Sequence, residues 1–311
     1  MRPTSAALRA GFLGLVSLVM LWLPAHSAEK HPVRPDFSGY QRLLSRYVVV
    51  TSGKGQPLDT RFDYEQLFVD ERVHTLKRSD RLNQVRQQLL TTPASQLSEP
   101  DRRAWLLNLH NFLVIERATL HLLVPNRGFL RVKSVDEIFR AEGHFAEVPC
   151  VEFDAASYSI GRLERELIHG DTGDPWEPRA TASDPRFLFA LNRGLAGDAP
   201  ILPWAFHGDS IEAQLDRATT LATSLPRIVR ADAKLKRLEL SNLFSEYRVD
   251  FGGIDEVRPW LEKHAARDVR RALNQLPQAF APQFRAADRV LNQLERSKSP
   301  GSSPDSARVN S

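Results

Sequence analysis

The stretch that most constrains this chain is residues 184–202, which read DPRFLFALNRGLAGDAPIL. Within it, residues 187–191 form a run of apolar side chains with turn-forming residues on both sides. A short apolar run with such flanks is typical of a fully buried strand. Gly194, Gly197 and Pro200 follow, and they favour an irregular loop. We therefore expect a buried strand that ends in a glycine-rich loop, a common position for a functional site.

That loop lacks the side chains that most often carry covalent chemistry. Between Asn192 and Leu202 there is no Cys, Ser, Thr, His or Lys. Nucleophilic catalysis needs such a side chain, together with a group that activates it. The stretch therefore predicts the geometry of a site without predicting a reaction.

The N-terminus has the pattern of a secretory signal peptide. Arg2 and Arg9 give a positively charged start, residues 11–23 are apolar, and small residues precede Glu29. The alternative is a transmembrane anchor, but 13 apolar residues are fewer than the ~20 that a span requires. We expect residues 1–28 to be removed, leaving an exported, periplasmic protein without a membrane span.

The composition of the remaining chain is that of an ordinary globular protein. Apolar residues make up 42% of the sequence and charged residues 26%, so a packed core is expected. The formal charge of +4 falls to +2 when Arg2 and Arg9 are subtracted, and the remaining charges are mixed in sign. No basic stripe is present, and we expect no nucleic-acid partner. Cys150 is the only cysteine, which excludes an intramolecular disulfide.

Hydrophobic spacing predicts an α+β fold, a mostly helical single domain around a small, mainly antiparallel sheet. The domain is expected to span residues 29–294, and a disordered tail, poor in apolar residues, is expected at 295–311. Helices are predicted in the first part of 37–50, at 64–90 with a break near 79–80, and at 101–124, 132–140, 159–169 and 210–224. Residues 257–276 are predicted to form one helix or a pair of helices, and 280–294 a final helix. The predicted strands lie at 148–153, at 187–191, and at 227–231 and 235–240, the last two as a hairpin.

The helix predicted at 101–124 carries polar residues on two faces. Asn108 and Asn111 fall among apolar residues, so their amides need buried hydrogen-bond partners. Two alternatives stay open: these amides brace the backbone of a neighbouring loop, or one of them lines a site. The opposite stripe, at 100° per residue, is expected to be exposed and contains Arg103, His110, Arg117 and His121.

No metal site or cofactor is predicted. His110 and His121 are eleven residues apart, which separates them by about 16 Å along a helix, too far to share one ion. Cys150 falls in the strand predicted at 148–153, with no base beside it in the sequence. A cysteine in such a position is usually an inert, buried side chain.

Four blocks of the sequence resemble the motifs of one family, and they occur in the same order. AWLLNLHN at 104–111, DPRFLFALN at 184–192, LSNLFSEYRVDF at 240–251 and DRVLN at 288–292 are similar to AFWxNxYN, DPRxHFALN, LSxxFxWYxxDF and DWxLN. These motifs belong to the family catalogued as domain of unknown function 547 (DUF547). The resemblance extends over about residues 37–292 and implies one domain across nearly the whole mature chain.

The chain departs from this pattern at the family's cysteine and histidine positions. Members of the family usually continue after Asn192 with CGSxSCPP, whereas this chain reads RGLAGDAP. Arg193 and Asp198 replace the two cysteines, and Leu188 and Arg165 replace two histidines. The resemblance therefore implies a degenerate member, a pseudoenzyme with respect to any Cys/His centre. Thiolate chemistry needs both a sulfur and a base, so we do not expect it here.

We expect a non-catalytic binding domain for an unidentified small-molecule or protein ligand. The candidate pocket residues are Asn108, Asn111, Arg165, Asn192, Arg193, Gly194 and Asp198. The alternative is a hydrolase or transferase whose acid–base and anion-binding groups are Asp198, Arg193, Arg165 and Glu164. A third alternative is that Arg193 and Asp198 form only a surface ion pair that closes the loop.

The signal peptide leads to a direct prediction. Mature protein isolated from the periplasm of a Gram-negative host should begin at Ala28 or Glu29, because the small residues of the cleavage region end there. N-terminal sequencing checks this, and an intact Met1 would contradict both the cleavage and the export.

Overall fold

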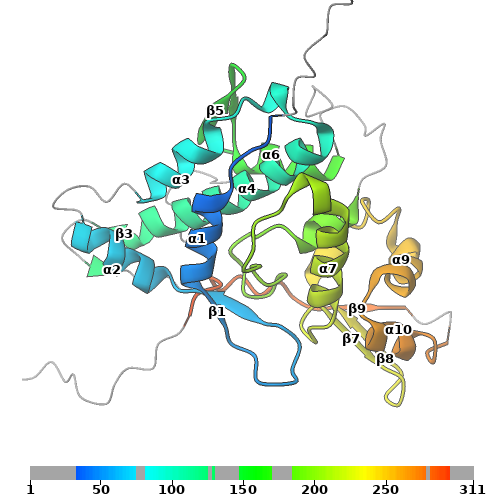
Figure 1. The fold of residues 1–311 in the computed structure, drawn as a ribbon. Coiled ribbons are helices and arrows are strands. Elements are labelled where there is room, and N and C mark those ends of the chain that lie inside the picture. The colour runs from blue at the N-terminus through cyan, green and yellow to red at the C-terminus, as the bar shows by residue number, and fades with distance from the viewer. Residues whose placement is uncertain are drawn as a thin grey trace, which may run out of the picture. The chain divides into compact units, whose positions relative to one another are not determined.

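The computed structural model describes residues 33–74, 81–124, 128–129, 147–169, 184–277 and 281–294. The predicted signal peptide, the helix expected at 132–140 and the predicted C-terminal tail lie outside these residues. In the described part the fold is α+β, mostly helical with short strands, as the sequence predicts (Figure 1). No helix in that part is both long and apolar enough to cross a membrane.

Helix α4, Glu99–Leu122, is a central helix of the described fold, since elements from both earlier and later in the chain pack against it. Every residue from 104 to 116 is buried, because helices contact α4 on several sides. A helix surrounded in this way has no exposed stripe. The expectation that His110 is exposed is therefore wrong, since its side chain is 0% exposed. The elements that contact α4 are α2 (Tyr64–His74), α3 (Arg81–Leu90), α6 (Ile160–His169), α7 (Ile211–Thr223) and the 3₁₀ turn η4 (Gly208–Ser210).

The chain up to α4 forms one helical layer and one hairpin. Helix α1, Ser38–Tyr47, buries Tyr40, Leu43, Leu44 and Tyr47, the spacing of one helical face, against α2 and α3. It continues directly into strand β1, Val48–Val50, which pairs antiparallel with β2, Thr60–Phe62. A short 3₁₀ turn, η2 (Ala94–Gln96), precedes α4.

Two further antiparallel hairpins follow α4. Strands β3 and β4 are Leu123–Val124 and Gly128–Phe129, and β5 and β6 are Val151–Phe153 and Ala156–Tyr158. Cys150 lies one residue before β5 and is half-buried, so it is less enclosed than predicted. Ser159 caps α6 as expected, because its hydroxyl accepts a hydrogen bond from the Arg162 N–H at 3.1 Å.

The apolar run at 187–191 is buried but is not a strand. Pro185–Phe189 forms a 3₁₀ helix, η3, whose start is capped by the Asp184 carboxylate accepting from the Arg186 N–H at 3.1 Å. The strand prediction is wrong because Asp184 and Pro185 together form a helix start. Burial alone does not distinguish a short buried helix from a strand. The predicted loop does follow, and Gly194 has a φ of 75°, a conformation that favours glycine.

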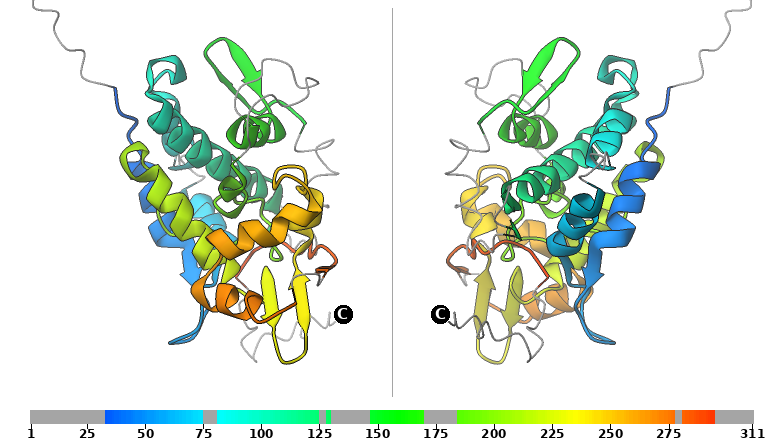
Figure 2. Two further views of the ribbon diagram at one scale, coloured as in Figure 1. Left: turned by 90° about the vertical axis from the view of Figure 1, so that its right-hand side faces the viewer. Right: turned by 90° about the vertical axis from the view of Figure 1, so that its left-hand side faces the viewer.

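The C-terminal part combines a three-stranded sheet with short helices (Figure 2). The predicted hairpin is confirmed, since β7 (Val229–Asp232) and β8 (Arg237–Leu240) pair antiparallel, and β9 (Gln283–Phe284) adds to β8 in parallel. The helix predicted at 280–294 is wrong in its described part, where the chain is extended. The remaining elements are α8 (Asn242–Glu246), η5 (Ile254–Glu256), α9 (Val257–His264) and α10 (Arg267–Leu273).

The extended C-terminal segment is held by the loop that follows η3. The Asn292 N–H donates to Gly194 O at 2.7 Å, and the Ala196 N–H donates to Val290 O at 2.8 Å. A Cβ atom on Gly197 would lie 2.9 Å from the carbonyl oxygen of Asp288. Only glycine at position 197 therefore permits the backbone at Asp288 to come this close. The backbone hydrogen bonds between the loop and residues 290–292 take the place of the helix predicted at 280–294.

The two buried amides of α4 brace two loops. Asn108 bonds both backbone groups of Phe206, accepting from its N–H at 2.9 Å and donating to its carbonyl at 2.8 Å. Asn111 accepts from the Asn192 N–H at 2.8 Å and donates to Ala190 O at 3.0 Å. The prediction that these amides are buried and brace loop backbone is confirmed.

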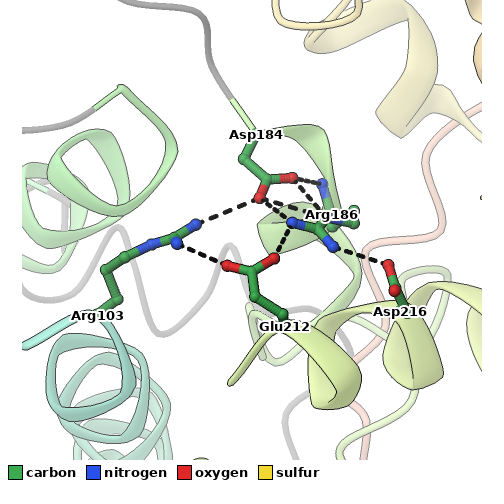
Figure 3. Close-up of polar contacts among 5 residues, drawn as sticks. All are labelled: Arg103, Asp184, Arg186, Glu212 and Asp216. Atoms are coloured by element: carbon green, nitrogen blue, oxygen red, sulfur yellow. Dashed lines mark hydrogen bonds and ion pairs between the residues drawn. The ribbon is translucent and has the colours of Figure 1, made fainter. Parts of the chain in front are cut away.

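Five charged side chains join the start of α4 to η3 and α7 (Figure 3). Arg103 bonds Glu212 at 2.8 Å and Asp184 at 3.3 Å. Arg186 bonds Asp184 at 2.8 Å and Asp216 at 2.7 Å, and it also contacts Glu212. Burial raises the pKa of Asp184, but the hydrogen bonds and charge of Arg186 outweigh burial and hold that pKa below its ordinary value.

Replacing either buried amide should destabilise the protein. We expect Asn108→Leu and Asn111→Leu each to lower the free energy of unfolding by about 1–3 kcal/mol, because buried loop backbone loses its partners. Urea unfolding measures this change, with Asn274→Leu as the control, since Asn274 is exposed and should change stability by less than ~0.5 kcal/mol. Wild-type midpoints for both α4 variants would contradict the bracing role.

The ion network should make stability depend on pH in the acid range. The folded pKa of Asp184 is lowered, so its contribution is present above the ordinary aspartate value, ~3.9, and is lost as the pH falls through the folded pKa. We expect Arg186→Met to be less stable than wild type at pH 6, and the difference to shrink on acidification. Unfolding measured at several pH values checks this, and a difference independent of pH would contradict it.

Candidate functional site

A cavity of about 430 Å³ lies beside α4. Its walls come from α4, α6, the loop after η3, α8 and the extended C-terminal segment. Apolar side chains form part of the wall, namely Val114, Ile160, Ile168, Leu195 and Leu243. The polar part includes His110, Glu164, Arg193, Asp198, Ser241 and Tyr247. A cavity of this volume with mixed walls is of the size that holds a small organic molecule.

Three of the candidate pocket residues line this cavity, namely Arg165, Arg193 and Asp198. The other four are not among the residues that line it. Asn108 and Asn111 brace the loops from α4, as described above. Asn192 Oδ1 accepts from the Gly194 N–H at 3.0 Å, and this bond shapes the turn into the loop.

Arg193 is the central cation of the polar wall. Its Nε lies 2.7 Å from Asp198 Oδ2, and one terminal nitrogen donates to the Tyr247 hydroxyl at 2.8 Å. The guanidinium carbon also lies 5.0 Å from the centre of the Tyr247 ring. The side chains of Arg193 and Asp198 are only 14% and 12% exposed, so they form a mostly enclosed pair rather than a surface one. Burial lowers the pKa of Arg193, but Asp198 and neighbouring groups outweigh this and raise it.

Glu164 is an ionised carboxylate in the cavity wall. It projects from α6, and the Tyr247 hydroxyl donates a hydrogen bond to its Oε1. Burial raises the pKa of Glu164, but His110, Arg193 and Tyr247 together outweigh burial and lower it to about 2. Burial and the neighbouring Glu164 carboxylate raise the pKa of Tyr247, so this hydroxyl keeps its proton and acts as a donor.

His110 lines the cavity, although the helical spacing predicted it on an exposed face. Its Nε2 lies 3.7 Å from Glu164 Oε2. Its Nδ1 lies 3.1 Å from Asn111 Oδ1. Asn111 Nδ2 already donates to Ala190 O, so the amide cannot be reversed and its oxygen faces the imidazole. Nδ1 therefore carries the proton, and a neutral His110 presents the Nε2 lone pair.

One sequence signal could have identified His110. It stands directly before Asn111 in the 104–111 block, where apolar residues fill every helical direction. A polar residue in such a stretch is buried whatever its phase. The helical wheel assumed one exposed side, and this helix has none between residues 104 and 116.

Three further arginines of the wall have carboxylate partners. Arg227 bonds Asp59 through both terminal nitrogens, at 2.7 and 2.9 Å. Arg285 bonds Glu239 at 2.6 Å. Arg165, 43% exposed, lies 3.6 Å from the exposed Glu147. These three arginines therefore add no unpaired cation to the wall.

The described wall carries few groups that could act as nucleophiles. Its hydroxyls belong to Ser241 and Tyr247, and Cys150 is not among the residues that line the cavity. Ser241 Oγ is buried and has no hydrogen-bond partner among the described residues. The arrangement can bind and orient a polar molecule and can exchange a proton at His110 Nε2.

Comparison with known proteins gives one match. Residues 94–221 fit the family model described as "Protein of unknown function, DUF547". No curated protein and no solved structure significantly matches the chain. The matched segment contains α4, α6, η3 and the loop with Arg193 and Asp198, and this match supports membership of the DUF547 family.

Proposed function

We propose that this chain is an exported binding domain that holds a small polar organic molecule in the cavity beside α4. The cavity combines an apolar part with polar groups that converge from several elements, the usual composition of a small-molecule site. The polar groups are held rigidly, because Asn111 fixes His110 and Asp198 fixes Arg193. The N-terminal pattern of charged, apolar and small residues supports export.

One observation carries this proposal. His110 Nε2 and Ser241 Oγ are buried in the cavity wall without hydrogen-bond partners among the described residues. A buried polar group left unpaired costs roughly 1–3 kcal/mol. A ligand with complementary polar groups would recover that free energy on binding, whereas an apolar occupant would not.

The loop chemistry favours binding over catalysis. Arg193 and Asp198 take each other as partners, so neither is available as an acid–base group. Arg193 also bonds the hydroxyl of Tyr247, which in turn bonds Glu164. The loop and the two helices are thereby tied into one rigid wall, which suits recognition of a fixed ligand shape.

A second candidate function is acid–base catalysis at His110. The observation that favours it is the tautomer set by Asn111, which leaves the Nε2 lone pair beside the cavity and the Glu164 carboxylate. This is the arrangement of a general base whose orientation is fixed by a neighbouring side chain. Turnover by wild type, lost in His110→Gln, would establish this alternative.

Filling the cavity should abolish ligand binding without unfolding the protein. Gly161 lies in the cavity wall, within helix α6, so a larger side chain is compatible with its backbone. We expect small polar fragments to bind wild type and Gly161→Ala but not Gly161→Phe, because only the phenyl ring occupies the space. Ligand-observed NMR with a fragment library measures this, and thermal unfolding verifies that all three proteins are folded.

The alanine variant is the matched control, because it changes the same position while leaving most of the volume open. Equal binding of the fragments by the folded phenylalanine variant would place their site elsewhere and would overturn the proposal.

A further inference from the structure

Two acceptors face each other across the cavity wall, at His110 Nε2 and Glu164 Oε2. The atoms are 3.7 Å apart, beyond the range of about 2.7–3.2 Å for a hydrogen bond to nitrogen. The neutral imidazole offers a lone pair there, because its proton lies on Nδ1 toward Asn111. The carboxylate is ionised, so it offers only lone pairs.

Resting on the binding function proposed above, we propose that the cavity takes a ligand with a protonated primary amine, which donates to both His110 Nε2 and Glu164 Oε2. Two atoms 3.7 Å apart can both lie within about 2.8 Å of one bridging nitrogen. Such a bridge must supply two hydrogens, since both of its partners are acceptors. A primary ammonium has three, whereas an alcohol has one.

The charges around the cavity favour a cation in the same place. Arg227, Arg285 and Arg165 each contact a carboxylate, and Arg193 contacts Asp198. His110, Arg193 and Tyr247 all act on Glu164, but only Arg193 carries a permanent charge, and Arg193 also faces Asp198 and Glu246. The enclosed carboxylate therefore lacks a full countercharge among the described groups, and an ammonium would provide it.

The rest of the cavity suits the carbon skeleton of a small amine. Val114, Ile160 and Ile168 lie in the wall near α4 and α6, and Leu243 lies on α8. Ser241 Oγ offers one further polar contact, for a group at another position on the ligand. The ligand class is thus a small primary amine with an apolar body.

A series of benzyl compounds separates charge from the number of donors. Benzylamine carries a cation with three N–H donors, protonated dimethylbenzylamine has one, and benzyltrimethylammonium has none. Benzyl alcohol is neutral with one donor, and benzoate is an anion. We expect benzylamine to bind roughly tenfold or more tightly than each of the others, the effect expected when a hydrogen bond to a charged group is lost.

Binding is measured by titration with ¹⁵N-labelled protein at pH 7.5, following the side-chain nitrogens of His110. Their signals are assigned by their absence in His110→Gln. Free protein should show Nε2 as the unprotonated nitrogen, and benzylamine should shift that signal. An imidazolium in the free protein at this pH would overturn the proposal, because Nε2 would then be a donor to Glu164.

The matched variants are Glu164→Gln and Glu147→Gln, which make the same chemical change at two places. Glu164→Gln removes the charge and offers an amide N–H to Nε2, so benzylamine affinity should fall roughly tenfold or more. Glu147 lies at the cavity with a side chain that is 63% exposed, and its variant should change the affinity less than about twofold. Equal losses in both variants would contradict the bridge.

The outcomes separate this inference from the binding function itself. If alcohols or carboxylates bind in the cavity at least as tightly as benzylamine and are lost in Gly161→Phe, the cavity is a binding site and the amine assignment is wrong. If benzylamine binds tightest, shifts His110 Nε2 and is weakened only by Glu164→Gln, both stand. If benzylamine and library fragments bind wild type and Gly161→Phe equally, both fall.

Discussion

A carboxamide buried without partners costs about 1–3 kcal/mol, and α4 buries two of them, at Asn108 and Asn111. Each amide bonds loop backbone, and each fixes one donor and one acceptor of that backbone. The loops before α7 and after η3 are thereby positioned by the central helix rather than by any sheet. Asn111 in this way fixes the loop that carries Arg193 and Asp198 of the cavity wall relative to α4, which carries His110.

The same principle extends from the backbone to the polar side chains of the cavity. Asn111 fixes the tautomer of His110, Asp198 fixes Arg193, and Tyr247 connects Arg193 to Glu164. His110 and Asn111 share α4, Arg193 and Asp198 share the loop after η3, and Tyr247 at the end of α8 joins that loop to α6. The ionised Glu164 carboxylate is stable in this enclosed position because the Tyr247 hydroxyl donates a hydrogen bond to it and the positive charge of Arg193 lies nearby, and both lower its pKa. Hydrogen bonds and ion pairs among these side chains therefore hold the wall in place, in addition to apolar packing.

Local chemistry was readable from the sequence, and tertiary context was not. The amides, the Ser159 cap and the β7–β8 hairpin follow from short-range rules, and all were predicted correctly. The strand expected at 187–191 failed because a buried apolar run carries no period that separates a strand from a short helix. The burial of His110 was not predicted because a helical-wheel projection assumes one solvent-exposed face. Helix α4 has no such face around His110, since segments from distant parts of the chain enclose it.

The end of the domain completes the wall of the cavity. The segment around Asp288 lines it, and Asn292 bonds the backbone of Gly194, almost a hundred residues earlier. A chain emerging from the ribosome thus exposes α4 and the Arg193 loop well before the C-terminal segment that pairs with that loop has been made. Through that interval the Glu164 carboxylate and the apolar wall remain open to water. A chain that travels unfolded through a translocation channel avoids this half-built stage, since all of its segments then become available for folding together.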